Sequence, residues 1–298
     1  MKPFTHRYKT VGLAIALALL ALPKVTCAGE VSKATEQLHL RYEAYWGGIH
    51  IADFTLSMRN GGDTYENRFH LETRGLTRYF TNMGVKAIST GRIIQPPESN
   101  GVPMAQRYVA THYRTEYTNT KHHRWVDITF NQPPKPAKAV TGTSPVTGRE
   151  KNWNPKDKGP EILNRVEPQH RIGVNDPISL IPQIMAVVRT HLAGGAKTGV
   201  AKGFDGRRRF DMHITYLGKA TRTIAKTKHE TYRVRIDPQP VAGFKKRHKI
   251  LWNGAAYDFY ISRDGNFLPL QIVPVKHGPV LTMIEKCPSE CELKAGED

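Results

Sequence analysis

The chain has 298 residues, of which 39% are hydrophobic, so it can bury a proper core as one large domain or two small ones. No internal repeat is visible, which argues against a repeat array. Its 44 Lys and Arg residues outnumber the 26 Asp and Glu residues and give a formal charge of +18. This balance favours an anionic partner, although a solvated basic surface explains it equally well.

The first 28 residues have the pattern of a signal peptide. Lys2, Arg7 and Lys9 precede an uncharged apolar run from Val11 to Leu22, and Ala28 is a small residue at the cleavage position. The run is shorter than the roughly 20 residues that a helix needs to span a bilayer. The sequence therefore predicts cleavage after Ala28, a mature chain without a transmembrane span, and localisation in the periplasm of a Gram-negative-type envelope.

Cys27 leaves an alternative open, because a cysteine after an apolar run can be the lipidated first residue of a lipoprotein. Lipid-attachment sites place Leu three residues earlier and a small residue directly before the cysteine, but here Lys24 and Thr26 stand in these places. Removal of Cys27 with the signal peptide is the favoured interpretation. It takes away four basic residues and no acidic one, so the mature chain keeps a formal charge of +14.

The mature chain begins with the two-residue periodicity of β-strands. Apolar and polar residues alternate from Leu38 to Ala44, and the segment Trp46–Gly48 interrupts them. The alternation resumes at Ile49, and its parity shifts by one at Ala52. This pattern predicts a hairpin with a bulge or a kinked long strand.

Further strands follow near residues 65–71 and, as a pair rich in aromatic and β-branched side chains, between 107 and 130. From about 131 to 173 the chain is rich in Pro, which predicts a long loop excursion. A domain linker is the alternative, but the strands after this stretch resemble those before it. We therefore expect residues 29–298 to form a single β-rich domain.

One helix is predicted after this excursion. Asp176 suits the N-cap, Pro177 suits the first helical position, and apolar residues recur at intervals of three and four through Arg189. Gly194 and Gly195 end the helical stretch. The helix is expected to pack on the sheet.

The remaining sequence again predicts strands, near residues 210–216, 232–236, 250–252, 257–261 and 268–272. Asn253-Gly254 and Asp264-Gly265 are strong hairpin signals between them. So many sequential antiparallel strands predict an all-β fold. Its curved sheet would form a barrel, half-barrel or β-spiral with one packed helix.

Four segments in this order resemble one family: Tyr42–Met58 (YEAYWGGIHIADFTLSM), Asn175–Leu180 (NDPISL), Phe204–Phe210 (FDGRRRF) and Pro240–Phe244 (PVAGF). They resemble the periplasmic domain of unknown function family 3108 of proteobacteria, over roughly Leu38 to Ile284. The resemblance implies an envelope protein with a long curved antiparallel sheet, a fold that elsewhere encloses lipid or lipoprotein acyl chains. It implies no catalytic residues.

Two basic clusters supply the candidate ligand-binding residues. Guanidinium groups bind phosphate or carboxylate in a bidentate manner, and in a strand Arg207 and Arg209 would share one face while Arg208 takes the other. For the first cluster, Arg207 to Arg209, the alternative is a structural turn with solvated arginines. For the second, Lys245 to Lys249, the alternative is an exposed charged loop or edge that blocks aggregation. The candidate anion-binding residues are Arg207, Arg209, Lys245, Lys246, Arg247 and Lys249.

The remaining cysteines, Cys287 and Cys291, are predicted to form a disulfide in an oxidising compartment. Three residues separate them, so they do not form a redox-active CxxC motif. The local histidine group of His112, His122 and His123 lacks zinc-type spacing, so we predict no metal and no cofactor.

No GxSxG elbow, P-loop or GxGxxG motif is present, which favours a protein without catalytic activity. The first hypothesis is a periplasmic cell-envelope protein that binds or carries an anionic amphiphile of the lipid or lipopolysaccharide type, or assists envelope assembly. Basic residues would neutralise the head group, and a curved sheet would enclose apolar chains.

The second hypothesis is a structural factor with a filled sheet interior that binds peptidoglycan or an envelope protein partner on its surface. A hydrolase with a site assembled from distant residues is the third. Because export takes nucleic acid out of reach, no nucleic-acid partner is expected despite the basic charge.

Overall fold

The computed structural model describes residues 36–97, 104–120, 122–145, 161–245, 252, 254–291 and 293. These residues all belong to the unit Lys33–Asp298. The predicted signal peptide with Cys27, and the candidate residues Lys246, Arg247 and Lys249, lie outside the described residues.

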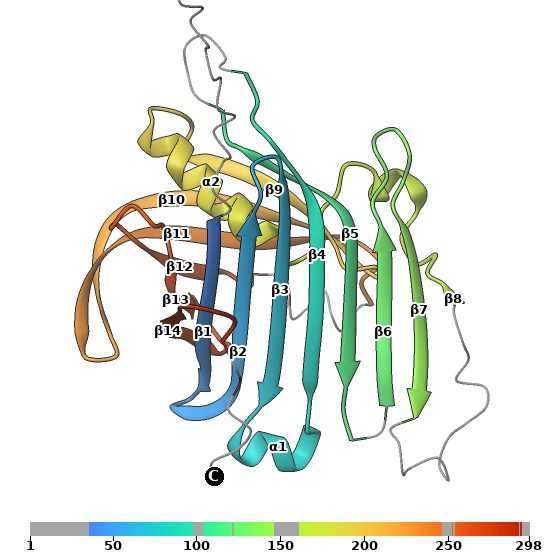
Figure 1. The fold of residues 1–298 in the computed structure, drawn as a ribbon, viewed down its shortest axis with the longest axis horizontal. Helices are drawn as coiled ribbons and strands as arrows, with labels where there is room; N and C mark the ends of the chain where they lie inside the picture. The colour runs from blue at the N-terminus through green and yellow to red at the C-terminus, as the bar shows by residue number, and fades with distance from the viewer. Residues whose placement is uncertain are drawn as a thin grey trace, which may run out of the picture. The chain divides into compact units, whose positions relative to one another are not determined.

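The described residues form a single antiparallel sheet of fourteen strands, in the order β8-β7-β6-β5-β4-β3-β2-β1-β14-β13-β12-β11-β10-β9 (Figure 1). Two meanders, β1 to β8 and β9 to β14, join where β1 pairs with β14, so the predicted all-β fold is confirmed as a curved sheet that does not close. The strands are β1 (Glu36–Trp46), β2 (Ile49–Asn60), β3 (Thr64–Thr73), β4 (Gly84–Ile94), β5 (Arg107–Thr118), β6 (His122–Thr129), β7 (Lys138–Pro145), β8 (Glu161–Ile162), β9 (Thr198–Phe204), β10 (Arg209–Ile224), β11 (Thr227–Ala242), β12 (Tyr257–Ser262), β13 (Pro269–Pro274) and β14 (Val280–Cys287).

The shift in hydrophobic parity near residue 50 has a structural cause. Strands β1 and β2 pair as a hairpin around the turn at Gly47 and Gly48, both of which have positive φ. The register shifts between Ala44 and Tyr45, as a β-bulge does, because one extra residue moves the following side chains to the opposite face. Of the two predicted explanations, the hairpin with a bulge is confirmed.

The predicted loop at about 131–173 contains elements that the sequence did not suggest. Strand β7 pairs with β6 along its length, β8 pairs with β7, and Pro168–Arg171 forms a short 3₁₀ helix. The buried positions Ala137, Ala139 and Thr141 carry small side chains, so this strand lacks the bulky alternating residues by which the others were recognised. The prediction of a loop is wrong for residues 138–145.

The predicted helix is present as α2 (Leu180–Leu192), with both ends shifted toward the C-terminus. Asp176 accepts hydrogen bonds from the backbone N–H groups of Ile178 (2.9 Å) and Ser179 (3.0 Å), so it caps a turn that precedes the helix. A second helix, α1 (Gly75–Thr81), was not predicted. Its described side chains include no buried one, so it shows no core-facing stripe.

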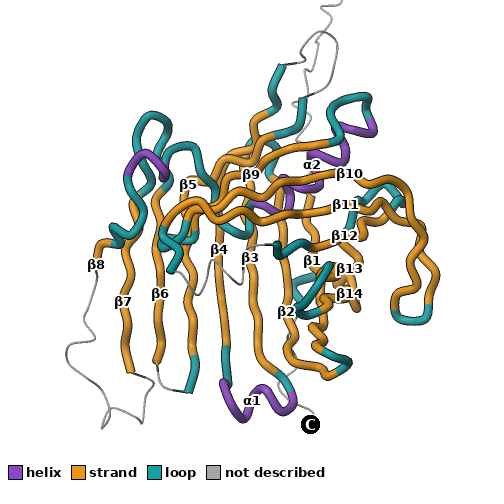
Figure 2. The backbone as a smooth tube through the Cα atoms, turned by 180° about the vertical axis from the view of Figure 1, so that it is seen from behind, coloured by secondary structure: helices purple, strands orange, loops and turns teal. Residues whose placement is uncertain are grey.

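The interior between the two meanders is packed with side chains. Figure 2 shows β10 and β11 running across the strands of the first meander, and a shared core cluster joins Leu40 and Phe54 with Phe204 and Leu268. A second cluster packs α2 against β10 and β11. The described core therefore favours a filled sheet interior over a hollow barrel.

Asn175 links β9, at one edge of the sheet, to β5 of the first meander. Its backbone pairs with β9 through Lys202 and Phe204, and its side-chain amide bonds the backbone of Ala110 (2.9 Å) and Tyr108 (2.7 Å) in β5. Strand β6 pairs with β5 only from His112 onward, so the amide of Asn175 satisfies backbone groups that β6 leaves free.

Candidate anion-binding pocket

The site is built on the turn Asp205–Arg208, which connects β9 to β10. Asp205 Oδ1 accepts hydrogen bonds from the backbone N–H groups of Arg207 (2.9 Å) and Arg208 (2.7 Å). This closes an Asx turn, with Gly206 at φ +87°. Because β10 begins only at Arg209, strand alternation does not govern Arg207 and Arg208, and both side chains line one pocket. The expectation that these two residues face opposite sides is wrong.

Two glycines allow the turn to approach its neighbours. A Cβ on Gly206 would lie 2.7 Å from Cγ1 of Val126, so the turn presses directly on β6. A Cβ on Gly243, which has φ +77°, would lie 2.2 Å from the carbonyl oxygen of Arg207. Both positions therefore require glycine. The segments FDGRRRF and PVAGF are thus brought together at this site.

The cavity beside the turn has a volume of about 510 Å³, within the range of roughly 300 to 1,000 Å³ that is typical of ligand sites. Its walls combine aromatic and apolar side chains with guanidinium groups. We call it the arginine pocket; its main lining residues are Tyr113 and Tyr117 of β5, Arg124 and Val126 of β6, Pro177, Asp205, Arg207 and Arg208.

Positive charge exceeds negative charge in the arginine pocket. Asp205 is the one carboxylate among the described lining residues, and Arg208 already pairs with it at 2.6 Å. Burial lowers the pKa of Arg207, and the nearby guanidinium groups of Arg165 and Arg124 lower it further. Arginine stays charged at neutral pH even so. The pocket therefore attracts anions.

Arg207 and Arg208 are held differently. Arg208 lies over the rings of Phe244 and Trp252 at 5.8 Å, in addition to its ion pair with Asp205, so its position is fixed. Arg207 donates from Nη2 to Thr141 Oγ1 at 3.3 Å, while its buried Nε has no hydrogen-bond partner among the described residues. The Nε atoms of Arg171 and Arg263 are buried without a partner in the same way, so this donor alone does not mark a ligand site. What an anion in the cavity can contact is the part of the guanidinium groups that lines it.

Of the other predicted anion-binding residues, the two that the structure describes, Arg209 and Lys245, do not line this pocket. Arg209 is only 5% exposed and pairs with Asp211 at 2.7 Å, so it supports the start of β10. Lys245 is exposed and follows Phe244 directly. Sequence analysis missed Arg124 and set Arg208 apart. No local pattern marks Arg124, since only the pairing of β5 with β6 and the folding of the turn onto β6 bring it to the site.

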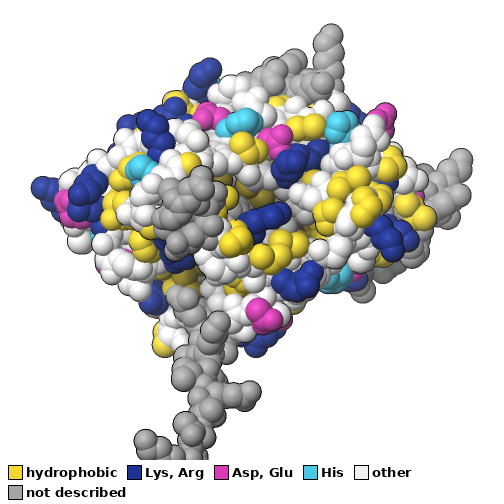
Figure 3. Space-filling model, turned by 90° about the horizontal axis from the view of Figure 1, so that it is seen from above, with side chains coloured by type: hydrophobic (Ala, Val, Ile, Leu, Met, Phe, Trp, Pro, Cys, Tyr) yellow, Lys and Arg dark blue, Asp and Glu magenta, His cyan; other side chains and the backbone are white. Residues whose placement is uncertain are grey.

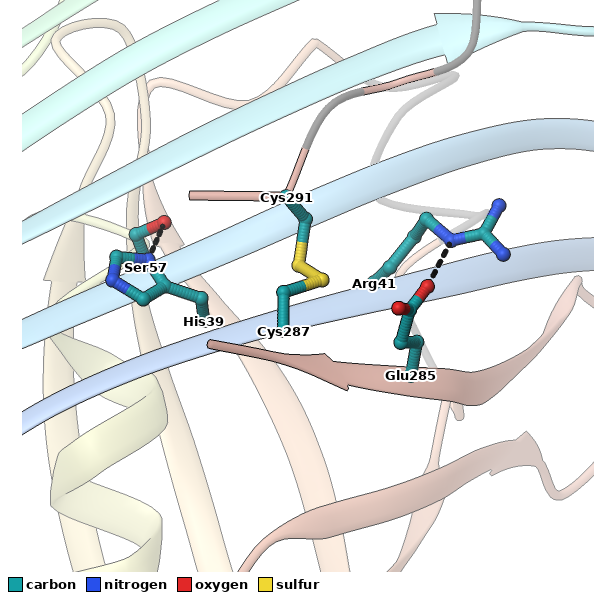
Figure 4. The surroundings of a disulfide bond; sticks show 6 residues. All are labelled: His39, Arg41, Ser57, Glu285, Cys287 and Cys291. Carbon is teal, nitrogen blue, oxygen red and sulfur yellow. Dashed lines mark hydrogen bonds and ion pairs between the residues drawn. A yellow bond between two sulfur atoms is a disulfide. The ribbon is translucent and has the colours of Figure 1, made fainter. Parts of the chain in front are cut away.

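The predicted disulfide between Cys287 and Cys291 is confirmed, with an S–S distance of 2.07 Å (Figure 4). Cys287 lies opposite His39 in the pairing of β14 with β1. Figure 4 shows the bridge beside the ion pair of Arg41 with Glu285 (3.5 Å). The disulfide lies next to Glu290, whose carboxylate accepts a hydrogen bond from Arg68 at 2.9 Å.

Two histidines of the local group His112, His122 and His123 have separate acidic partners. His112 pairs with Asp127 at 3.0 Å and His123 with Glu116 at 3.4 Å. The one group of potential metal ligands found in the described part of the chain is instead Glu43, His50 and Asp53. Asp53 there is bound by Arg74 (2.8 Å) and His50 (2.6 Å), so ion pairing accounts for this group.

The surface repeats the charge imbalance of the sequence. In Figure 3, Lys and Arg side chains are spread over the visible face among hydrophobic ones, with fewer Asp and Glu. No helix within the described residues is long and apolar enough to cross a membrane.

No curated protein matches the sequence. Among solved structures, a beta-barrel-like protein of domain of unknown function DUF1849 from Brucella abortus is 11% identical. The match covers 85% of this chain and 96% of that chain, with a TM-score of 0.42, a likeness too distant to support an argument. The family model "Protein of unknown function (DUF3108)" matches residues 41–284. The chain belongs to this family.

Proposed function

We propose that this protein is exported to the periplasm and there binds an anionic amphiphile of the cell envelope, of the lipid or lipopolysaccharide type. Its phosphate or carboxylate head group would occupy the arginine pocket. The observation that carries the proposal is the meeting of Arg124, Arg207 and Arg208 at one cavity, in which Asp205 is the one carboxylate among the described lining residues.

The pocket walls support an amphiphile over a simple inorganic anion. Tyr113 and Tyr117, with Val126 and Pro177, offer rings and apolar surface next to the guanidinium groups. Burial raises the pKa of Tyr113, so this phenol stays neutral and adds no negative charge. An anion joined to a short apolar segment matches both parts of the wall. Because the described interior is packed, we expect the pocket to receive the head-group end and not a whole acyl chain.

Calorimetric titration of the mature protein with dihexanoyl phosphatidic acid, a water-soluble probe, tests this function. Arg207→Gln should weaken binding by about tenfold or more, because a charge-assisted bidentate contact is lost. Arg68→Gln is the matched control, since Arg68 lies outside the pocket and pairs with Glu66 and Glu290. Inorganic phosphate should bind more weakly than the amphiphile. Equal binding by the Arg207 and Arg68 variants would refute the proposal.

Material purified from the native periplasm tests the cellular part of the proposal. Its N-terminus should lie at or close to Gly29, and lipid extraction with mass spectrometry should recover an anionic amphiphile. Full-length chain in the cytoplasm, or a diacylglyceryl group on Cys27, would overturn the cleavage assignment.

A second candidate function is surface binding of peptidoglycan or an envelope protein, and the packed interior is the observation that favours it. In that case the arginine pocket would receive a carboxylate of the partner. Co-sedimentation with purified peptidoglycan, abolished by Arg207→Gln and accompanied by no co-purifying lipid, would favour this alternative.

A further inference from the structure

A group of exposed apolar side chains lies at one end of the first meander, away from the described core. Their exposed fractions range from 55% to 82%, high for such large apolar residues. We call this group the apolar tip; it consists of Trp46 and Ile49, which flank the β1–β2 turn, and Leu76, Tyr79 and Phe80 in α1.

The two segments of the apolar tip are neighbours. Figures 1 and 2 both show α1 and the β1–β2 turn at the same end of the strands. The backbone N–H of Arg74, at the start of α1, donates to the carbonyl of Ile51 at 2.9 Å. A Cβ on Gly75 would lie 3.4 Å from the carbonyl of His50. The two segments that carry the five exposed apolar residues therefore lie next to each other.

Polar contacts attach α1 to the sheet. The buried side chain of Arg74 pairs with Asp53 at 2.8 Å, and Thr77 Oγ1 donates to the carbonyl of Ile51 at 2.7 Å. None of the described side chains of α1 is buried. The helix thus turns its polar contacts toward the protein and leaves its apolar residues exposed, the reverse of a helix that packs on a core.

The chemistry of the apolar tip matches the interface of an anionic bilayer. Within residues 46–51 and 74–83 the exposed charged residue is Arg78, whereas Arg74 and His50 pair with Asp53. Trp and Tyr favour the boundary between head groups and acyl chains, and nearby basic side chains attract anionic lipid. A protein partner would instead be expected to offer complementary acidic residues to Arg78.

The pocket and the tip also lie toward the same end of the strands. Helix α1 connects β3 to β4, and Gly84 at the start of β4 pairs with Thr118 at the end of β5. The residues that flank Thr118, Tyr117 and Asn119, both line the arginine pocket. Contact through the apolar tip would therefore bring this side of the pocket toward a membrane.

We propose that the apolar tip inserts into the interface of an anionic phospholipid bilayer and docks the protein there. This surface is separate from the arginine pocket, and docking does not depend on the pocket being filled. Docking follows from the exposed aromatic residues, the exposed Arg78 beside them and the polar attachment of α1.

Binding to vesicles of equal parts phosphatidylcholine and phosphatidylglycerol tests the docking. The double variant Tyr79→Ser, Phe80→Ser should bind about tenfold or more weakly, since two exposed rings no longer enter the interface. Leu217→Ser is the matched control, because Leu217 is 46% exposed and distant from the tip in the sheet. Brominated lipid should quench Trp46, as seen by comparison with Trp46→Phe. Thermal unfolding of all variants should match that of the unaltered protein.

The outcomes separate docking from the proposed function. If the tip variant loses vesicle binding but keeps its affinity for dihexanoyl phosphatidic acid, docking is supported independently of the pocket. If Arg207→Gln leaves the affinity for dihexanoyl phosphatidic acid unchanged while the tip variant still loses vesicle binding, the proposed function is refuted and docking is supported. Unchanged vesicle binding by the tip variant overturns docking. A dimer that the tip variant converts to a monomer, without vesicle binding, assigns the surface to a second copy of the chain.

Discussion

The two aspartate turns of this protein are built alike and used in opposite ways. Asp176 and Asp205 each accept hydrogen bonds through Oδ1 from the backbone N–H groups two and three residues later. The second oxygen of Asp176 accepts from the hydroxyl groups of Ser89 (2.7 Å) and Ser179, in a fully buried site. The second oxygen of Asp205 binds Arg208, beside an Arg207 that retains a free donor.

The difference shows how similar local structures serve stability in one place and binding in another. Around Asp176 every carboxylate contact is internal, and Tyr65 extends the network through Ser179 at 2.7 Å. The Asp205 turn instead places Arg207 and Arg208 beside Arg124 at a cavity in which Asp205 is the one described carboxylate. The comparison predicts that changes at Asp176 alter folding, whereas changes at Arg207 alter ligand binding.

The largest effect is expected for Asp176→Ala. Loss of the carboxylate leaves two buried hydroxyl groups and two backbone N–H groups without their acceptor, which should lower the free energy of unfolding by about 3 to 5 kcal/mol. Loss of a helix cap alone costs only about 0.5 to 2 kcal/mol. Urea unfolding of the variant beside Pro177→Ala, which should change little, checks this value. A loss below 1 kcal/mol would show that the network is not needed for stability.

A smaller effect is expected for Gly243→Ala. The added methyl group meets the carbonyl of Arg207 and the backbone has positive φ, so the free energy of unfolding should fall by about 1 to 3 kcal/mol. The displaced turn should also weaken binding of dihexanoyl phosphatidic acid. Gly173→Ala, also at positive φ but with open space around it, is the control that isolates backbone strain. Equal losses in both variants would exclude a contribution from the close approach to Arg207.

Sequence reasoning succeeded where bulky residues alternate or recur, as in β1, β2 and α2, because burial of those side chains decides the structure. It failed at β7, whose buried residues are small, and at α1, whose apolar residues stay outside the core. At the pocket it found Arg207 but discounted Arg208, since the Asx turn could not be separated from a strand by pattern alone. Arg124 reaches the site only through long-range strand pairing.

The pH dependence of stability distinguishes Asp176 from a carboxylate held by ion pairs. Burial raises the pKa of Asp176 above its ordinary value, despite the hydrogen bonds from Ser179 and Ser89. The folded state then binds a proton more tightly than the unfolded state. The stability of the native protein relative to Asp176→Asn should therefore be greatest below about pH 3.9 and decline as the pH rises through the folded pKa.

Asp258 should show the opposite pH dependence of stability. Burial alone would raise its pKa, but the ion pairs with Arg235 (2.5 Å) and Arg233 (2.6 Å) outweigh burial and hold the pKa below its ordinary value. Stability relative to Asp258→Asn should thus be present above about pH 3.9 and be lost as the pH falls through the folded pKa. Urea midpoints of the two variants across this range should diverge from the native protein in opposite directions. Parallel curves would show that burial does not dominate at Asp176.

The smallest change in stability is expected for Arg207→Gln. Its guanidinium group is half-buried near Arg165 and Arg124, with one weak contact to Thr141, so its charge contributes little to folding. The free energy of unfolding should change by less than about 0.5 kcal/mol, and relief of repulsion between arginines acts toward a gain. The same substitution should weaken the binding of dihexanoyl phosphatidic acid most at low salt, because added ions screen the attraction. A loss of stability as large as that of Asp176→Ala would place Arg207 in the folding network. The two aspartate turns would then serve the same purpose, and Arg207 would no longer support the proposed binding function.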